Sequence, residues 1–204
     1  MSLLSKHDTE LTGEYGYHLL KRCYQEDLVD NLYQIHIDRP VVELGNEFCR
    51  YYFATHIETG KEYFAILFDR NLNLAIKTLN ILANSSYAGI NNLIAYSLVR
   101  LSTSKKYVAA AIVDAYDPAQ SLAEYISKNG PIEYDDIVQE VITPIANILS
   151  YCASHKINCN NINPNNITFT KDRNLVLREF FISLPNFDQI PAFLAPELSD
   201  ALPE

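Results

Sequence analysis

An asparagine-rich loop is the part of the sequence whose residue types best suit a polar site. Six asparagines fall within nine residues, at positions Asn158, Asn160, Asn161, Asn163, Asn165 and Asn166. Side-chain amides can orient a hydroxyl group, and their oxygens can ligate a hard cation. The same amides also satisfy the backbone of turn-rich loops, which needs no function. We therefore favour a structural loop over a polar site.

The cysteines and histidines show no spacing that indicates catalysis or metal binding. The four cysteines are scattered and form no CxxC pair, at positions Cys23, Cys49, Cys152 and Cys159. Cys159 has no plausible base beside it, so we expect a buried thiol rather than a nucleophile. His36, His56 and His155 are too far apart in sequence to suggest a ligand set. Unpaired cysteines in a chain of this size indicate reduced thiols and a cytoplasmic location.

Composition and charge exclude several classes of partner. The chain has 204 residues, is 48% hydrophobic and 20% charged, and carries a formal net charge of −9. Such a negative charge argues against nucleic-acid binding, because phosphate would be repelled. No stretch approaches about 18 uninterrupted apolar residues, and the first ten residues are polar. We therefore expect a globular protein with no direct membrane insertion and no secretory signal.

Hydrophobic periodicity places these residues on secondary-structure elements. The patterns predict helices over residues 14–32, 73–83, 121–128 and 134–155, and extended segments over residues 33–42, 47–54, 62–68, 92–101, 106–114, 167–169 and 175–177. Gly60 supplies the positive φ that a hairpin turn between residues 54 and 62 needs. Pro144 must kink the long helix or end its first part. Because strands dominate first and helices later, the sequence predicts an α+β chain with two lobes.

Several short strings, taken in order, resemble the protein-kinase fold. The resemblance is carried by Leu44-Gly45, Tyr52, Ala54 and Ala65-Ile66 in the strands, by Asp114-Ala115-Tyr116 as a hinge, by Ile162, Pro164, Asn166 and Ile167 in the loop, and by Phe180 and Ala195-Pro196-Glu197 near the end. It implies a two-lobed fold. The expected parts are an N-terminal extension with an amphipathic helix over residues 1–40, an antiparallel β-sheet N-lobe over residues 41–113, and a truncated, mostly helical C-lobe over residues 114–204.

Relative to a kinase, the residues that would carry phosphoryl transfer are replaced. Leu67 stands where the family has its ATP-anchoring lysine, and Asn161 stands where it has the catalytic aspartate. An amide cannot accept a proton near neutral pH. The partner glutamate is also missing, since the stretch between Asp69 and Asp114 has no acidic residue in a chain that holds 25. Glu179 replaces the metal-binding aspartate. The resemblance therefore implies no catalytic residue.

The same comparison predicts that no cofactor is bound. A vestigial nucleotide cleft would comprise Gly45, Tyr51, Ala65, Asp114 and Thr168. Only Gly45 is left of the phosphate-binding glycines, and Tyr51 would fill much of the adenine slot itself. Asn166 and Glu179 are the candidates for a magnesium site, because Mg²⁺ needs only one or two protein oxygens beside a nucleotide. We expect neither metal nor ATP to bind.

The function predicted from these absences is that of a catalytically inactive, pseudokinase-like domain acting as a protein-interaction or regulatory module. Its partner would be another protein, or another domain of a larger parent protein. An alternative is an enzyme, a divergent magnesium-dependent phosphotransferase or nucleotidyl-transferase that uses Glu179 and Asn166. A third interpretation discards the resemblance and leaves an α+β domain of unknown role, because a fold alone does not define a function.

Overall fold

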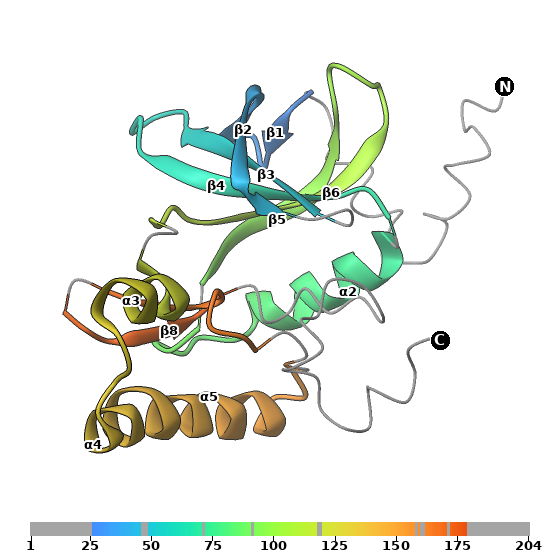
Figure 1. The fold of residues 1–204 in the computed structure, drawn as a ribbon. Coiled ribbons are helices and arrows are strands. Elements are labelled where there is room, and N and C mark those ends of the chain that lie inside the picture. Colours follow the sequence, from blue (N-terminus) through green and yellow to red (C-terminus); the bar gives the residue numbers. More distant parts are fainter. Residues whose placement is uncertain are drawn as a thin grey trace, which may run out of the picture. The chain divides into compact units, whose positions relative to one another are not determined.

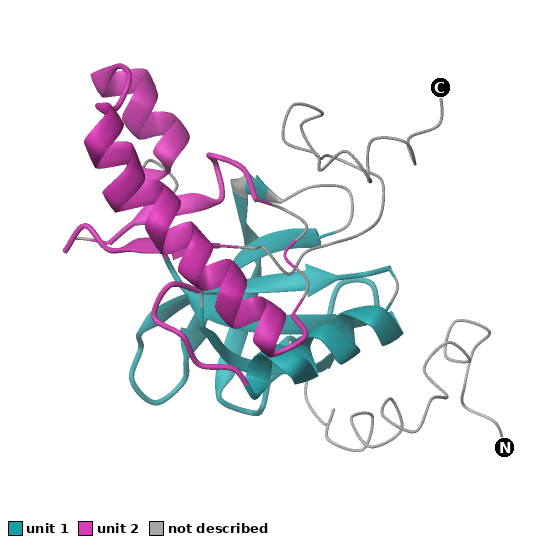
Figure 2. Cartoon of the chain, turned by 90° about the horizontal axis from the view of Figure 1, so that it is seen from below, with its two compact units in different colours: residues 1–84, 92–115 teal, residues 85–91, 116–204 magenta. Residues whose placement is uncertain are grey.

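A computed structural model describes residues 26–45, 49–70, 72–90, 92–117, 120–157, 159, 162–170 and 172–178 (Figure 1). The chain divides into two compact units, coloured separately in Figure 2. Unit 1 comprises residues 1–84 and 92–115, and unit 2 comprises residues 85–91 and 116–204. None of the helices in the described ranges is long and apolar enough to cross a membrane.

Unit 1 is built on a six-stranded antiparallel sheet in the order β1-β2-β3-β4-β6-β5 (Figure 1). The strands are β1 (Leu28–Val29), β2 (Tyr33–Gly45), β3 (Cys49–His56), β4 (Glu62–Phe68), β5 (Leu93–Arg100) and β6 (Tyr107–Asp114). The sheet nearly closes on itself, because a bridge between Glu26 and Arg100 joins the segment before β1 to the far edge strand. Next to this closure Lys105 forms a 2.9 Å ion pair with Glu26, and its hydrogen bond lowers the pKa of that carboxyl group.

The hairpin between β3 and β4 forms as the sequence predicts. Gly60 adopts a φ of +68°, and its amide donates to the carbonyl oxygen of His56 at 2.9 Å. This left-handed conformation is accessible to glycine at little cost, and it turns the chain back toward β4. The register then pairs Tyr52 with Ala65, so the hairpin decides which residues of the two strands share a face.

The two faces of this sheet bury different sets of side chains. The inner face holds the core of unit 1, which includes Ala54, Ala65, Leu67, Val99 and Ala110. The opposite face is covered by helix α2 (Leu72–Ala83), whose Leu72, Ile76, Leu79 and Leu82 are buried. On that face Tyr96 donates from its hydroxyl group to Asn80 of α2 at 3.0 Å. Both faces are apolar because neither is open to water: the inner face lies inside the nearly closed sheet, and α2 covers the opposite face.

The described residues of unit 2 include two helical segments. Helix α3 (Leu122–Asn129) begins at Ser121, whose hydroxyl oxygen accepts from the amide of Glu124 at 3.2 Å. The second segment runs through α4 (Tyr134–Asp136), the π-helical turn η3 (Ile137–Ile142) and α5 (Thr143–Ser154). Pro144 lies in the first turn of α5, and the Thr143 hydroxyl group donates to the carbonyl oxygen of Val138 at 2.8 Å. The prediction that Pro144 kinks the long helix or ends its first part is not met by an end, because Ile142 and Thr143 keep right-handed helical dihedral angles and the helix continues through residue 144. What changes next to Pro144, which cannot donate to the preceding turn, is the hydrogen bonding, from π-helical in η3 to α-helical in α5.

A small hairpin completes the described part of unit 2. It pairs β7 (Ile167–Phe169) with β8 (Leu175–Leu177), as predicted. Leu177 also donates from its amide to the carbonyl oxygen of Gly89 at 2.8 Å, which ties the segment 85–91 to this hairpin. In the same segment the Tyr87 ring stacks on Tyr151 of α5, with centroids 4.6 Å apart.

The expected two-lobed protein-kinase-like fold is wrong. The described residues form mostly antiparallel sheet, and the six-stranded sheet of unit 1 is nearly closed. Unit 2 combines a β-hairpin with a few helices, so its described part is not a mostly helical C-lobe. The resemblance relied on short strings, which carry no information about the added edge strand Leu28–Val29 or about the bridge that closes the sheet.

The expected helix over residues 14–32 is also wrong where it can be assessed. Residues 14–25 lie outside the described ranges, but residues 26–32 form a bridge, turns and β1. Asp27, Asp30 and Asn31 have φ values of +57°, +50° and +58°. Such left-handed residues interrupt a right-handed helix, although Asp and Asn tolerate them better than most residues do.

Candidate functional site

Ala65, a predicted cleft residue, and Leu67, the predicted replacement of the ATP-anchoring lysine, lie on β4 in the core of unit 1. Ala65 and Leu67 are 0% and 1% exposed. Leu67 pairs with Ala110, which in turn pairs with Ser97, so all three are on the inner face of the sheet. The face covered by α2 carries Ile66 instead. A side chain at position 67 therefore points away from α2.

Tyr51 and Gly45 lie on other parts of the sheet. Tyr51 of β3 is 1% exposed and pairs with Ile66, so it is on the face opposite Ala65. Gly45 pairs with Arg50 at the end of β2. The structure therefore does not bring Tyr51 and Ala65 together as two walls of one slot.

Asp114, at the end of β6, takes part in an exposed ion pair. Lys61 lies 3.3 Å from its Oδ1 atom and 4.7 Å from the centroid of the Tyr63 ring. Hydrogen bonds to Tyr63 and to Asp114 raise the pKa of Lys61. Tyr63 is partly buried against the core of unit 1, whereas Lys61 and Asp114 are exposed, and a hydrated ion pair of this kind adds little stability.

In unit 2, an arginine that the sequence reasoning did not consider joins two predicted site residues. Arg178 donates from Nε to the hydroxyl oxygen of Thr168 at 2.8 Å and from its amide to the carbonyl oxygen of Asn166 at 2.7 Å. Its guanidinium lies 4.2 Å from the centroid of the Tyr116 ring. Asn161 and Glu179 lie outside the described residues. In the sequence, the signal for this cluster was that a basic residue, Arg178, directly precedes Glu179.

The asparagine loop supports its own backbone where it is described. The side-chain oxygen of Asn163 accepts from the amide of Asn165 at 2.9 Å, and its carbonyl oxygen accepts from Asn166 at 3.0 Å. These bonds are those of a local turn. They agree with the prediction that this segment is a structural loop and not a polar site.

Two cysteines that are seven positions apart in sequence meet at the end of α5. Ile157 donates from its amide to the carbonyl oxygen of Cys152 at 2.9 Å, and Lys156 has a φ of +58°. This helix-ending turn reverses the chain, and the thiols of Cys152 and Cys159 form a hydrogen bond. Burial, reinforced by the Cys152 thiol, raises the pKa of Cys159 far above its ordinary value. Both cysteines are free.

We expect Cys152 and Cys159 to react slowly with iodoacetamide at pH 8 while the protein is folded. Only the thiolate is nucleophilic, and a raised pKa leaves little of it. Labelling at each site, measured by peptide mass spectrometry, should be at least tenfold slower than in urea, where the pKa returns to its ordinary range. Cys152 is buried, whereas Cys159 is only partly buried. Labelling of Cys159 at the same rate in folded and unfolded protein would contradict its raised pKa.

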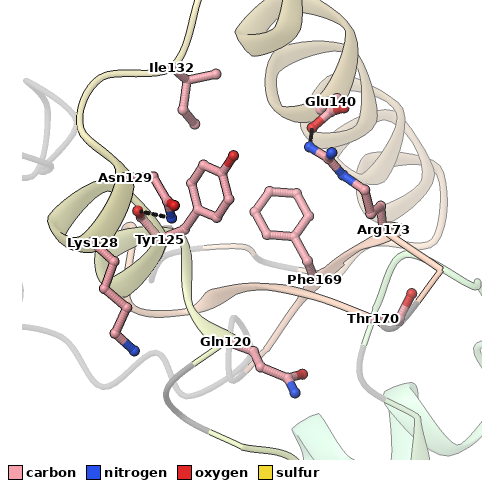
Figure 3. Close-up of a pocket in the computed structure, with 9 residues that line it drawn as sticks. All are labelled: Gln120, Tyr125, Lys128, Asn129, Ile132, Glu140, Phe169, Thr170 and Arg173. Atoms are coloured by element: carbon pink, nitrogen blue, oxygen red, sulfur yellow. Dashed lines mark hydrogen bonds and ion pairs between the residues drawn. The ribbon is translucent and has the colours of Figure 1, made fainter.

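An open pocket of about 400 Å³ lies in the described part of unit 2 (Figure 3). Tyr125 of α3 and Phe169 of β7 form much of its apolar surface, with ring centroids 6.2 Å apart and planes at 58°. Ile132 adds to this surface from the loop after α3. Figure 3 shows the two rings side by side in the pocket. No sequence pattern marked these residues, because they come from three separate segments.

Three charged side chains stand around the apolar surface. Arg173 and Glu140 form an ion pair of 2.6 Å at one wall, and this hydrogen bond raises the pKa of Arg173 (Figure 3). Lys128 of α3 also lines the pocket, and its ammonium lies 3.3 Å from Glu124 one turn earlier. All three are partly exposed, so they can contact a molecule that enters from solvent.

A tight turn presents Arg173 to the pocket. The carbonyl oxygen of Thr170 accepts from the Arg173 amide, and the Thr170 amide donates to Asn174, both at 2.9 Å. Arg173 has a φ of +58°, a left-handed conformation that the turn between β7 and β8 imposes. The sequence identifies residues 171–174 as a turn, but the function of Arg173 depends on its position beside α3 and η3.

No protein-family model matches this chain, and no curated protein matches its sequence. In the residues that the structure describes, no group of three or more His, Cys, Asp or Glu side chains could hold a metal ion.

Proposed function

We propose that the chain is a non-catalytic protein-interaction or regulatory module that binds its partner through the pocket of unit 2. The observation that carries this proposal is the pocket itself, with two aromatic rings at its surface and charged groups around them. No chemical step is assigned to any residue.

The pocket has the size and composition of a recognition site. Its volume of about 400 Å³ falls in the range of small-molecule and side-chain pockets, which are mostly apolar with a few polar groups. Tyrosine and arginine are enriched at protein interfaces, and Tyr125 and Arg173 both line this pocket. A single apolar side chain of a partner could be anchored here while its backbone stays at the rim.

The partner we propose is a protein in the cytoplasm. The net charge of −9 would repel the phosphates of a nucleic acid. Cys49, Cys152 and Cys159 are free thiols, and such cysteines are typical of a reducing compartment. Both points support a protein ligand inside the cell.

Replacing Tyr125 with alanine should weaken peptide binding by about tenfold or more, because truncating a central interface aromatic removes about 1–2 kcal/mol of binding free energy. Peptides would be selected from a displayed random library on the immobilised full chain. Their affinities for the wild type and for Tyr125→Ala would then be measured by fluorescence polarisation.

Tyr134→Ala is the matched control for this test. Tyr134 is 78% exposed, lies in α4 and does not line the pocket. Its replacement should leave the affinity unchanged, and both variants should keep a wild-type melting temperature within a few degrees. The proposed function fails if no peptide is selected, or if the selected peptides bind Tyr125→Ala as tightly as the wild type.

A further inference from the structure

We propose that helix α5 binds a second copy of this chain, with the two helices packed antiparallel along an uncharged apolar stripe. The stripe consists of Ile142, the last residue of η3, and of Ala146, Leu149 and Ala153 in α5. None of these four residues lines the pocket of Figure 3. The inference therefore does not depend on the proposed function.

Helix α5 packs on unit 2 with only one of its sides. Ile148 and Cys152 are its buried residues, and the Tyr151 ring is stacked on Tyr87. Gly89 also lies against this side, because a Cβ atom there would be 2.7 Å from Cγ1 of Ile148. In Figure 1 the hairpin of β7 and β8 and helix α3 lie on one side of α5. The opposite side of the helix is exposed.

The exposed side of α5 carries the stripe. Its four residues follow the spacing i, i+4, i+7 and i+11, which places them within about 60° of one another around an α-helix. Ile142 is 53% exposed and Leu149 is 38% exposed, and both alanines are exposed as well. No residue from Val141 to Ser154 is charged. Because a helix face that meets water usually carries charged side chains, this face is suited to burial against a partner.

The order of large and small side chains makes the stripe complementary to itself. In an antiparallel pair related by a two-fold axis between residues 147 and 148, Ile142 lies opposite Ala153 of the second copy. In the same pair Ala146 lies opposite Leu149 of the second copy. Each large side chain therefore meets a small one, as interdigitating helices require. A parallel pair would place each residue opposite its own copy and would lose this match.

Charges near the two ends of the helical segment favour the same direction. Asp135, Asp136 and Glu140 lie toward its start, and Lys156 follows its last turn. Glu140 is paired with Arg173, so the two exposed aspartates are the carboxylates available to a second copy. The antiparallel pair brings Lys156 of each copy beside η3 of the other, about one turn from these aspartates. Exposed charges of this kind set the direction of the pair more than its strength.

The size of the stripe indicates a weak dimer. Helix α5 has 12 residues and is about 18 Å long. Two helices of this length bury only part of the roughly 1,200 Å² at which stable interfaces begin. We therefore expect a monomer–dimer equilibrium with a Kd on the order of 10 to 100 μM.

Sedimentation velocity of the full chain measures this equilibrium. Between about 5 and 500 μM the wild type should shift from the monomer to the dimer sedimentation coefficient. Leu149→Glu buries an unpaired carboxylate in the stripe and should weaken association at least about tenfold. Leu74→Glu is the matched control, because Leu74 is 46% exposed on α2 and undergoes the same change. It should associate as the wild type does.

A size swap tests the antiparallel register. Ala146→Leu makes the stripe more apolar, yet it should weaken the dimer at least about threefold, because the larger side chain meets Leu149 of the second copy. The double variant Ala146→Leu, Leu149→Ala again places one large and one small side chain at each contact. It should recover association to within about threefold of the wild type. Both positions are exposed, so circular dichroism should show a folded chain for each variant.

The outcomes decide between this pair and other occupants of the stripe. A chain that stays monomeric up to about 500 μM overturns the inference, whether the stripe is open or another segment of the chain covers it. Tighter association of Ala146→Leu would indicate an unspecific apolar contact and would also overturn it. The same holds if Leu74→Glu dissociates the dimer and Leu149→Glu does not. Peptide binding at the pocket should be unchanged in Leu149→Glu, so a failure here leaves the proposed function intact.

Discussion

Leu67→Lys is expected to destabilise the protein by about 3 to 5 kcal/mol, because it places an unpaired ammonium group in an apolar core. Leu67 is 1% exposed and packs in the inner core of unit 1 with Ala65 and Ala110. A lysine there must either deprotonate or pull the strand open. Urea unfolding followed by circular dichroism measures the loss.

The control for this substitution is Leu74→Lys on α2. Leu74 is 46% exposed, so the same change should alter the unfolding free energy by less than about 0.5 kcal/mol. If Leu67→Lys does not fold at all, Leu67→Met keeps the volume and should cost less than about 1.5 kcal/mol. A Leu67→Lys protein of wild-type stability that binds Mg·ATP would show that position 67 faces a nucleotide cleft and would refute its placement in the core.

Gly89→Ala is expected to destabilise unit 2 by about 1 to 3 kcal/mol, the usual cost of overpacking. A Cβ atom at Gly89 would lie 2.7 Å from Cγ1 of Ile148 and 2.9 Å from a ring carbon of Tyr87. Neither neighbour can withdraw easily. Ile148 is 1% exposed, and the Tyr87 ring is stacked on Tyr151. Thermal unfolding monitored by near-ultraviolet circular dichroism reports on these tyrosines.

A double-mutant cycle distinguishes this clash from a backbone effect. Ile148→Ala alone should cost about 2 to 5 kcal/mol through the cavity it leaves. In that background Gly89→Ala should cost less than in the wild type, because the new methyl group enters the vacated space. Ala88→Ser changes an exposed neighbour by one atom and should have little effect. An unchanged cost of Gly89→Ala beside Ile148→Ala would mean that the two residues do not collide.

Local structure was largely predictable because it depends on neighbours in sequence. The β3–β4 hairpin follows from alternating apolar residues around Gly60, and α2 follows from apolar residues at helical spacing. The irregular hydrogen bonding just before Pro144 is consistent with its missing amide proton. The exception is the segment 26–32, where Asp27, Asp30 and Asn31 adopt left-handed conformations that hydrophobic spacing does not reveal.

The faces of the sheet were not predictable at the level of single residues. The string Ala65-Ile66-Leu67 fits a strand, but alternation alone cannot say which face α2 covers. The register places Leu67 opposite Ala110 on the inner face, and the Tyr96 hydroxyl bond to Asn80 identifies the covered face. The resemblance to kinases, which rests on short strings, placed Leu67 at the position of the ATP-anchoring lysine. Whether position 67 faces a cleft or the core depends on how the strands pair, and the sequence of one strand does not reveal this.

The candidate site also depends on tertiary contacts that the local sequence does not reveal. Tyr125, Phe169 and Arg173 come from a helix, a strand and a turn, so no spacing in the sequence relates them. Cys152 and Cys159 come together only because the chain turns at Lys156 after α5. Arg178 is a single basic residue in sequence, and its contacts with Thr168 and Tyr116 depend on the hairpin that carries it.

By itself, the sequence determined the charge of the chain, the content of apolar residues, and the order of most strands and helices, because these depend on composition and on spacing within a few residues. Only the tertiary structure decided that the sheet nearly closes through Glu26 and Arg100, that Leu67 is a core residue, and that a pocket forms around Tyr125. These features depend on contacts between distant segments, and such contacts are set by which apolar faces can be buried together.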